Sequence, residues 1–226
     1  TGMPALISWW IRDLTQLGPH ANPDAVQAIA AELLGRWAEP HRRYHRTRHL
    51  VEVFWAVGEL VDVAAIDTRD GVLARVAGWF HDAVYDPSAP PGANEAASAR
   101  LADQRLGALA VAPADVATVS ALVLLTAAHE PTSSTGADRL VRSAFHDADL
   151  WILCAETARF DEYCAQVREE YAHVPEAAYR AGRAEILGEF ARRPRLYATD
   201  HAHVHWEPSA RVNLDRELAR LAPENP

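Results

Sequence analysis

The stretch Val76-Ala-Gly-Trp-Phe-His-Asp-Ala-Val-Tyr85 places a histidine and an aspartate side by side within an otherwise apolar segment. Burying an ionised carboxylate in such surroundings is costly unless a partner compensates its charge. A divalent metal ion would do so, because imidazole and carboxylate groups are both common ligands of such ions. If His81 and Asp82 are metal ligands, other parts of the chain must supply the remaining ligands.

Most of the chain is predicted to be helical. Apolar residues recur at helical spacing, and Asn22 followed by Pro23 is typical of a capped helix start. We expect helices at 5–17, 23–38, 47–65, 70–84, 94–109, 113–129, 137–155, 156–172, 176–192 and 208–221, loops at 86–91 and 130–136, and a less regular segment at 195–206. No segment has a strand pattern, and no repeat or long linker divides the chain. The prediction is one all-α domain over residues 1–226, a helical bundle.

Composition narrows the functional classes. The formal net charge of −9 argues against a binder of nucleic acid polymers, which usually carries a basic surface. No apolar run is long enough to span a bilayer, and residues 1–4 have no signal-like character. The two cysteines, Cys154 and Cys164, are too few for a disulfide framework. We therefore expect a cytoplasmic protein with reduced thiols and no membrane partner; the sequence sets no oligomeric state.

Several polar motifs follow one another in a fixed order around the opening stretch. They are Arg43-Tyr-His45 with His49-Leu50, Phe80-His-Asp82 with Tyr85-Asp86, Asn94-Glu95 with Ser98-Ala99, Thr126 with His129, Asp147-Ala-Asp149-Leu150, Tyr163 with Val167-Arg168 and Glu170-Tyr171, Gly182-Arg183, and Arg211 with Asn213-Leu214. A His-Asp dipeptide alone recurs by chance, whereas the ordered set is far more specific. Over about residues 40–220 the chain resembles the HD (His-Asp) superfamily, in particular a bacterial group of predicted metal-dependent phosphohydrolases.

The resemblance implies an HD-type helical bundle with a His-His-Asp-Asp metal site. The residues in the matching positions are His49, His81, Asp82 and Asp149. Asp149 is preferred to Asp147 because the family pattern Asp-x-Asp-Leu matches at its second aspartate. The cofactor would be one divalent ion (Mn, Fe, Co, Ni, Zn or Mg), with a second metal possible near His129.

Four residues are expected to act in catalysis, and three of them have competing structural interpretations. In related enzymes the earlier histidine of such a pair, which corresponds to His45, lies near the scissile phosphate. This suggests that His45 is a general acid or a phosphate contact; a surface or structural role is the alternative. Glu95 is either an acid/base group or a carboxylate at a helix start. His129 could contact substrate, bind a second metal or interact with a helix C-terminus. Asp82 is the fourth.

Arginines are the expected substrate ligands, since guanidinium groups bind phosphoryl oxygens in pairs. The candidates are Arg43, Arg168 and Arg183, each of which could instead form an ordinary ion pair. Tyr197 is a weaker candidate. Asp86 either orients a histidine ligand or caps its loop.

Other histidines and the tryptophans are expected to have structural roles. His201, His203 and His205 alternate and would face one way on an extended segment, but a surface run is the favoured interpretation. His146 precedes Asp149 by one helical turn without matching the family pattern. The tryptophans at apolar helical positions are expected in the core; they include Trp9, Trp10, Trp55, Trp79 and Trp151.

The functional hypothesis is a metal-dependent phosphohydrolase, a phosphomonoesterase or pyrophosphohydrolase, that acts on a small anionic phosphorylated metabolite. A nucleotide is the leading substrate, and water activated by the metal is the nucleophile. The sequence contains no glycine-rich phosphate loop of the kind that would suggest a nucleotide-dependent kinase. One alternative is an HD-type di-iron oxygenase in which His129 and His146 add ligands. Another is a non-catalytic nucleotide-binding helical domain.

Overall fold

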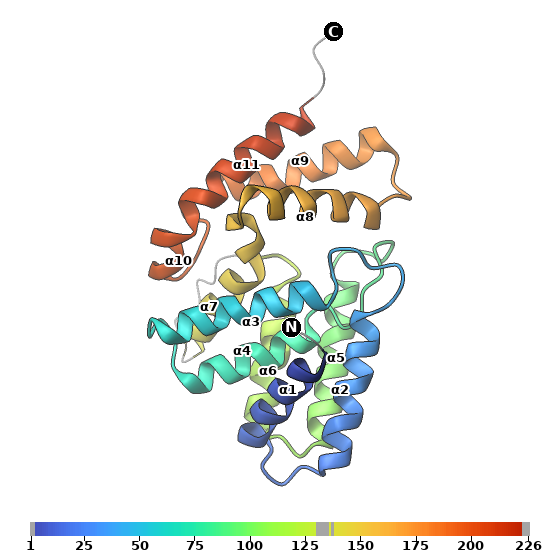
Figure 1. Cartoon of the computed structure of the whole chain (residues 1–226), viewed down its shortest axis with the longest axis vertical. Helices are drawn as coiled ribbons and strands as arrows, with labels where there is room; N and C mark the ends of the chain where they lie inside the picture. Colours follow the sequence, from blue (N-terminus) through green and yellow to red (C-terminus); the bar gives the residue numbers. More distant parts are fainter. Residues whose placement is uncertain (1–2, 130–135, 137, 223–226) are drawn as a thin grey trace.

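A computed structural model describes residues 3–129, 136 and 138–222 of the chain. Within these residues it contains eleven α-helices, one 3-10 helix and no strand, so the all-α prediction is confirmed (Figure 1). The helices are α1 (Met3–Leu17), α2 (Pro23–Trp37), α3 (Thr47–Asp62), α4 (Thr68–Phe80), α5 (Ala93–Ala108), α6 (Pro113–Leu125), α7 (Arg139–Asp149), η1 (Leu150–Cys154), α8 (Thr157–Glu170), α9 (Glu176–Arg192), α10 (Asp200–His205) and α11 (Glu207–Leu221).

Helix α4 is the centre of the bundle. It packs against α1, α3, α5, α6 and α7, and its residues from Gly71 to Phe80 are buried except Arg75. Gly78 permits a close approach to α3, because a Cβ atom there would lie 3.0 Å from Cε1 of Phe54. A helix surrounded in this way holds its C-terminal end, where His81 follows, in a fixed position.

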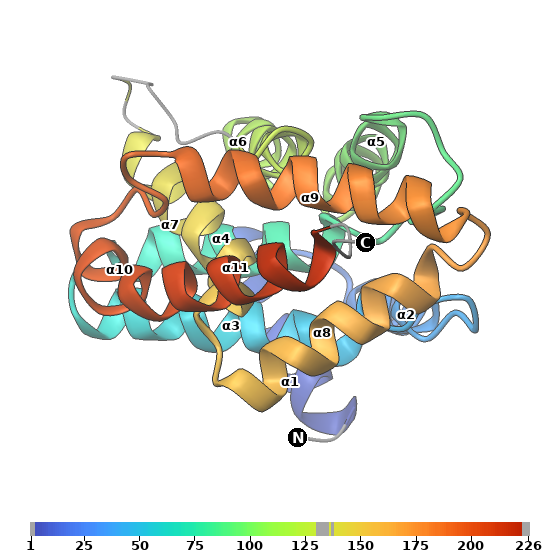
Figure 2. The same cartoon turned by 90° about the horizontal axis from the view of Figure 1, so that it is seen from above.

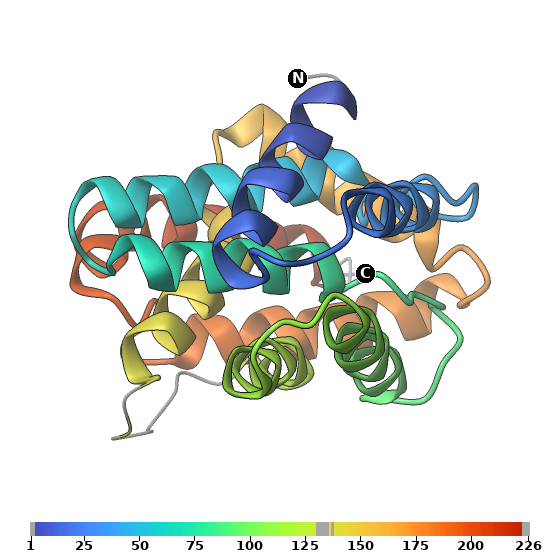
Figure 3. The same cartoon turned by 90° about the horizontal axis from the view of Figure 1, so that it is seen from below.

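Two further helix pairs flank this centre. Helices α5 and α6 pack side by side, run downward past α4 in Figure 1 and are seen end-on in Figure 3. Helices α9 and α11 pack together on the opposite side, with α8 next to them (Figure 2). The part of the chain that the structure describes thus forms one helical domain with a continuous core.

Most predicted helix positions are confirmed, including the start of α2, where the Asn22 side chain accepts hydrogen bonds from the N–H groups of Asp24 and Ala25. The largest errors are at C-terminal ends. Helix α4 ends at Phe80 instead of Val84, and α6 ends at Leu125 instead of His129. Apolar residues continue past both ends, and Ala83 is buried although it is not helical. Apolar periodicity therefore could not locate these ends.

Two other segments differ from the prediction. The helix expected at 137–155 changes to a 3-10 helix after Asp149, and part of the irregular segment at 195–206 forms α10. Thr199 explains the start of α10, because its side chain accepts the N–H of Ala202 as an N-terminal cap. The loop predicted at 130–136 lies, apart from Gly136, outside the described residues.

The tryptophan prediction holds for the centre of the bundle but not everywhere. Trp10 and Trp79 are fully buried, whereas Trp55 is 57% exposed on α3. Both cysteines are free, and burial raises the pKa of each thiol to about 12. None of the helices among the described residues has the length and hydropathy needed to cross a membrane.

Candidate metal centre

Three buried side chains from separate helices converge at one point. His49 lies in the first turn of α3, His81 directly follows α4, and Asp149 is the last residue of α7. The two Nε2 atoms are 3.1 Å apart, and each lies 3.3 Å from Oδ1 of Asp149. Their ligand atoms all fall within 4.8 Å of one another. This group, called the triad below, could hold a metal ion.

The outer nitrogens of both histidines have partners that fix the rings. Nδ1 of His81 lies 2.8 Å from the carbonyl oxygen of Gly78, and Nδ1 of His49 lies 3.0 Å from the hydroxyl of Tyr44. Because a carbonyl oxygen only accepts, Nδ1 of His81 carries a proton, and Nε2 would present a lone pair to the triad once it is deprotonated. Such outer hydrogen bonds are typical of metal-ligating histidines.

Charge at the triad favours a cation. Burial works against a charged His81, but the Asp82 and Asp149 carboxylates outweigh it and raise the pKa of His81 well above its ordinary value. Burial likewise opposes ionisation of Asp149, yet His81 and His49 hold its pKa well below the usual range. Two imidazoles and a carboxylate also suit a divalent transition-metal ion. The donor set therefore fits the cofactor expected from the sequence.

Asp82, the fourth expected ligand, lies beside the triad without belonging to it. Its Oδ2 atom is 3.0 Å from Nε2 of His81 and 3.7 Å from Nε2 of His49. The nearby histidines overcome the effect of burial and lower the pKa of this carboxyl far below its ordinary value. Asp82 is thus an ionised carboxylate next to the proposed ion, and its role as a ligand stays a prediction.

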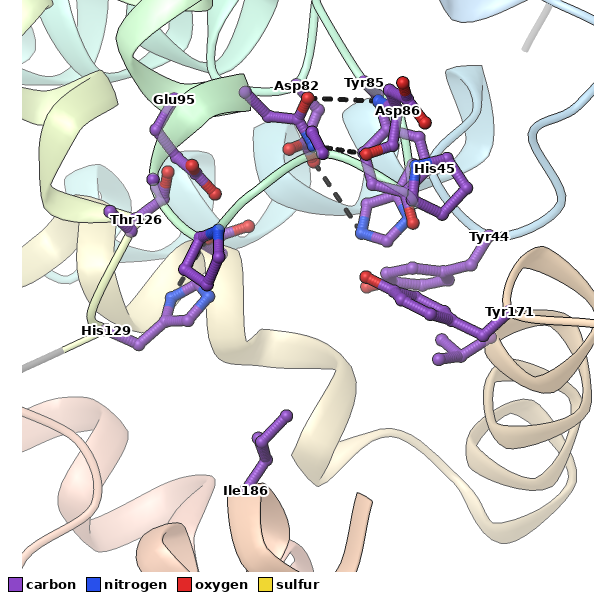
Figure 4. Close-up of a pocket in the computed structure, with 18 of the residues that line it drawn as sticks. Tyr44, His45, Asp82, Tyr85, Asp86, Glu95, Thr126, His129, Tyr171 and Ile186 are labelled. Atoms are coloured by element: carbon purple, nitrogen blue, oxygen red, sulfur yellow. Dashed lines mark hydrogen bonds and ion pairs between the residues drawn. The ribbon is translucent and has the colours of Figure 1, made fainter. Parts of the chain in front are cut away.

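A cavity of about 490 Å³ is lined by His49, Asp82 and Asp149 but not by His81. Figure 4 shows Asp82 and His45 on one side, Glu95 and His129 on another, and Ile186 of α9 across from them. The structure therefore brings all four expected catalytic residues to one cavity. Their functions are not tested by this placement.

His45 is held by a buried carboxylate that the sequence analysis did not single out. Oε2 of Glu170 lies 2.6 Å from Nδ1 of His45 and accepts the hydroxyl of Tyr85 at 2.9 Å. Oε1 accepts the N–H groups of Arg43, Tyr44 and His45 at 2.7–3.0 Å. Since a carboxylate only accepts, Nδ1 of His45 carries a proton, and Nε2 lies 4.0 Å from Oδ2 of Asp82.

Glu170 could have been noticed as part of the Glu170-Tyr171 motif, but nothing in the sequence pairs it with residue 45 across 125 positions. Burial opposes its ionisation, and the hydrogen bonds from His45 and the backbone overcome this and lower its pKa to about 2. Glu170 is therefore a charged, fully enclosed partner of a histidine in the cavity wall.

His129 occupies the other side of the triad. It follows α6 in a left-handed backbone conformation with φ of 46°, which is uncommon for a non-glycine residue. Its Nδ1 lies 3.5 Å from Oδ2 of Asp149, and burial lowers its pKa. It lies four residues beyond the end of α6, so it is not a residue of that helix's last turn.

The neighbouring His146 and Asp147 support this side instead of entering the cavity. Nε2 of His146 lies 3.0 Å from the carbonyl oxygen of His129, and Nδ1 lies 2.9 Å from Oδ1 of Asp147. Asp147 also accepts the N–H groups of Ala198 and Thr199. Both ring nitrogens of His146 thus face protein atoms, and it is not presented as a metal ligand. Asp149, not Asp147, belongs to the triad, as the family pattern implied.

Of the three candidate arginines, only Arg183 lines the cavity. Arg43 pairs with Glu169 at 3.2 Å, and Arg168 pairs with Glu176 at 2.9 Å. Neither lines the cavity, and each forms the ion pair given as its alternative, while the phosphate-binding role of both stays a prediction. Their partners are glutamates of α8 and α9 whose proximity follows from the tertiary packing.

Two residues near the cavity rim have local roles. Asp86 caps its loop, with Oδ1 accepting the N–H and the hydroxyl of Ser88 at 2.8 and 2.6 Å, and these bonds lower its pKa. Glu95 lies in the first turn of α5, as its structural interpretation expected, and also lines the cavity, where its acid/base role stays a prediction.

The remaining candidates lie elsewhere. His201 and His203 pair with Glu59 and Glu207, each at 2.7 Å, from a short helix instead of an extended strand. Tyr197 is fully buried and donates to the carbonyl of Leu150 at 3.0 Å, so it is not a phosphate ligand.

No protein-family model matches this chain, and no curated protein matches it at a significant level of similarity. The fold and the site therefore define an all-α protein with a buried histidine-histidine-aspartate group that could hold a metal ion.

Proposed function

We propose that the protein is an HD-type metal-dependent phosphohydrolase that acts on a small phosphorylated metabolite, with a nucleotide as the first candidate. The observation that carries the proposal is the buried triad of His49, His81 and Asp149, two of whose members, His49 and Asp149, line a cavity of about 490 Å³. A volume of several hundred cubic ångströms is typical of sites for small molecules. The order of the motifs along the chain supports the same family.

In this proposal the triad, with Asp82 as fourth ligand, would hold one divalent ion. A bound ion of this kind lowers the pKa of a coordinated water and polarises a phosphoryl oxygen. His45 would exchange a proton with the leaving group through Nε2, because its Nδ1 faces Glu170. Glu95 and His129 line the same space and would contact the substrate or its attacking water.

The proposal is tested with protein purified without chelator. Metal content is measured first, and release of phosphate is then assayed on a panel of phosphate esters and anhydrides with added Mn²⁺, Co²⁺, Ni²⁺, Mg²⁺ or Zn²⁺. His81→Ala should abolish both metal binding and hydrolysis with the helical fold retained. Absence of hydrolysis by the wild type under every condition, or an unchanged His81→Ala variant, would refute it.

One observation favours a second candidate, the di-iron oxygenase. Oδ2 of Asp149 faces His129 at 3.5 Å while Oδ1 faces the triad, so His129 and Asp149 would be the residues to hold a second ion. The orientation of His146 argues against it, since that residue cannot add a ligand without breaking its present contacts. Two irons per chain with a visible absorption band would favour the oxygenase, and one non-iron ion would exclude it.

A further inference from the structure

Arg183 of α9 is a cavity-lining cation whose charge is not matched by a carboxylate among the described residues. Its NH2 group donates to the hydroxyl of Tyr163, and its guanidinium lies over the Tyr163 ring at 5.1 Å. Its Nε atom is buried and has no hydrogen-bond partner. The neighbouring Arg180 differs, because it donates to the carbonyl oxygens of Arg220 and Ala222 at the end of α11.

A guanidinium in this state is suited to bind an anion. Buried polar groups are normally hydrogen-bonded, and an exception calls for an explanation such as a missing ligand. Guanidinium groups bind carboxylates and phosphates in a planar, two-pronged geometry. The other charged side chains that line the cavity are carboxylates and histidines, so Arg183 is the natural anion site within the described part of its wall.

Arg183 is separated from the triad by two aromatic rings. Tyr44 contacts Nδ1 of His49, the nitrogen that faces away from the triad, with ring centroids 4.7 Å apart. The Tyr44 and Tyr163 rings are 4.6 Å apart, and Arg183 lies beyond Tyr163. A chain of ring contacts through Tyr163 and Tyr44 thus connects the guanidinium to the outer nitrogen of His49.

Helix α9 gives a second measure of this separation. Arg183, Ile186 and Phe190 line the cavity from one face of the helix, and the Phe190 ring lies 6.1 Å from that of His129, beside Asp149. Seven residues of α-helix span about 10 Å. An anion at Arg183 would thus be a different group from a phosphoryl group at the triad, and Ile186 supplies an apolar surface between them.

We propose that the substrate is a phosphate ester with a second anionic group, a carboxylate or a phosphate, which Arg183 binds at the far end of the cavity. This inference rests on the proposed function for the site of hydrolysis. The spacer between the two anions is apolar or weakly polar and about as long as an aromatic ring or a sugar. Arg183 accordingly sets substrate specificity and does not stabilise the phosphoryl group that is cleaved.

The test compares aryl phosphates that differ only at the end remote from the ester: phenyl phosphate, 4-carboxyphenyl phosphate and 4-(phosphonomethyl)phenyl phosphate. The wild type should have a lower KM for one or both compounds with a second anion, and the better one identifies a carboxylate or a phosphate group. Arg183→Gln should raise that KM by about 10-fold or more, the loss of one charge-assisted hydrogen-bonded pair, with little change for phenyl phosphate. Arg180→Gln is the matched control on the same helix and should change neither.

Calorimetry with non-hydrolysable 4-carboxybenzylphosphonate, (4-phosphonomethyl)benzylphosphonate and benzylphosphonate gives a readout independent of turnover. Arg183→Gln should weaken the binding of the compounds with a second anion only. Tyr163→Phe, which keeps the guanidinium, should retain the preference and guards against a folding defect in the Arg183 variant. Equal affinity of the wild type for all three compounds, or equal weakening of all three by Arg183→Gln, would overturn the inference. Absence of hydrolysis with this binding pattern intact would instead count against the proposed function alone.

Discussion

Two histidine-rich segments of this chain, residues 41–49 and 201–205, have three histidines each and entirely different surroundings. In the first, His45 and His49 each use Nδ1 for an outer partner and direct Nε2 toward carboxylates at the cavity. In the second, His201 and His203 pair with single glutamates of α3 and α11, away from the cavity. The number of histidines is therefore uninformative. The two segments differ in whether the second ring nitrogen of a histidine, beyond the one held by an outer partner, faces carboxylates at the cavity.

The largest expected effect tests the first segment. His49→Ala removes one of the two imidazoles of the triad and leaves the Asp149 carboxylate with fewer partners. We expect loss of the bound metal and a fall in kcat/KM of more than about 100-fold, because even residues that only support ligands contribute factors of 10 to 100. Elemental analysis and phosphate release measure the two effects. Full metal content in this variant would remove His49 from the site.

Glu170→Gln tests the partner of His45. A glutamine can still accept the backbone N–H groups through its oxygen, but its NH₂ group would then face Nδ1 of His45 and move the ring proton to Nε2. We expect kcat to fall by about 100-fold, the scale of general acid–base catalysis, with the metal retained. Nitrogen-15 NMR of the histidine rings reports the tautomer directly.

Tyr85→Phe is the matched control, since it removes another hydrogen bond to the same Glu170 oxygen while leaving the tautomer of His45 unchanged. Its kcat should fall much less. If Glu170→Gln changes the tautomer and kcat stays at the wild-type value, His45 takes no part in proton transfer.

The same carboxylate should make stability depend on pH. The pKa of Glu170 is about 2 in the folded chain against an ordinary value of 4.5, so its ionised form stabilises the fold above about pH 4.5 and this contribution is lost as the pH falls toward 2. The difference between these two pKa values corresponds to about 3 kcal/mol. The free energy of unfolding is measured with urea on metal-free protein. The difference in this free energy between wild type and Glu170→Gln should become smaller as the pH is lowered from 5 to 3. A constant gap would contradict it.

The sequence predicts the helices well, and the triad follows from a resemblance because its members stand in ordered motifs. What it does not predict is pairing between distant elements. Glu170 contacts His45 through the packing of α8 against the 43–45 segment, and Arg43 pairs with Glu169 in the same way. Arg168 pairs with Glu176 across the turn between α8 and α9. The helix ends at Phe80 and Leu125 were also missed, because burial of apolar residues continues after the helical hydrogen bonds stop.

The smallest expected effect tests the second segment. His203→Ala removes one ion pair from a side chain that is 41% exposed, and Glu207 keeps its bonds to Arg211 and to the N–H of Leu196. Exposed pairs of this kind contribute at most about 1 kcal/mol. Metal content and kcat/KM should equal those of the wild type, and the free energy of unfolding should fall by no more than that amount. A His203→Ala variant that lost metal as His49→Ala does would show that the two histidine segments are not separate in function, and the distinction drawn from their second nitrogens would be wrong.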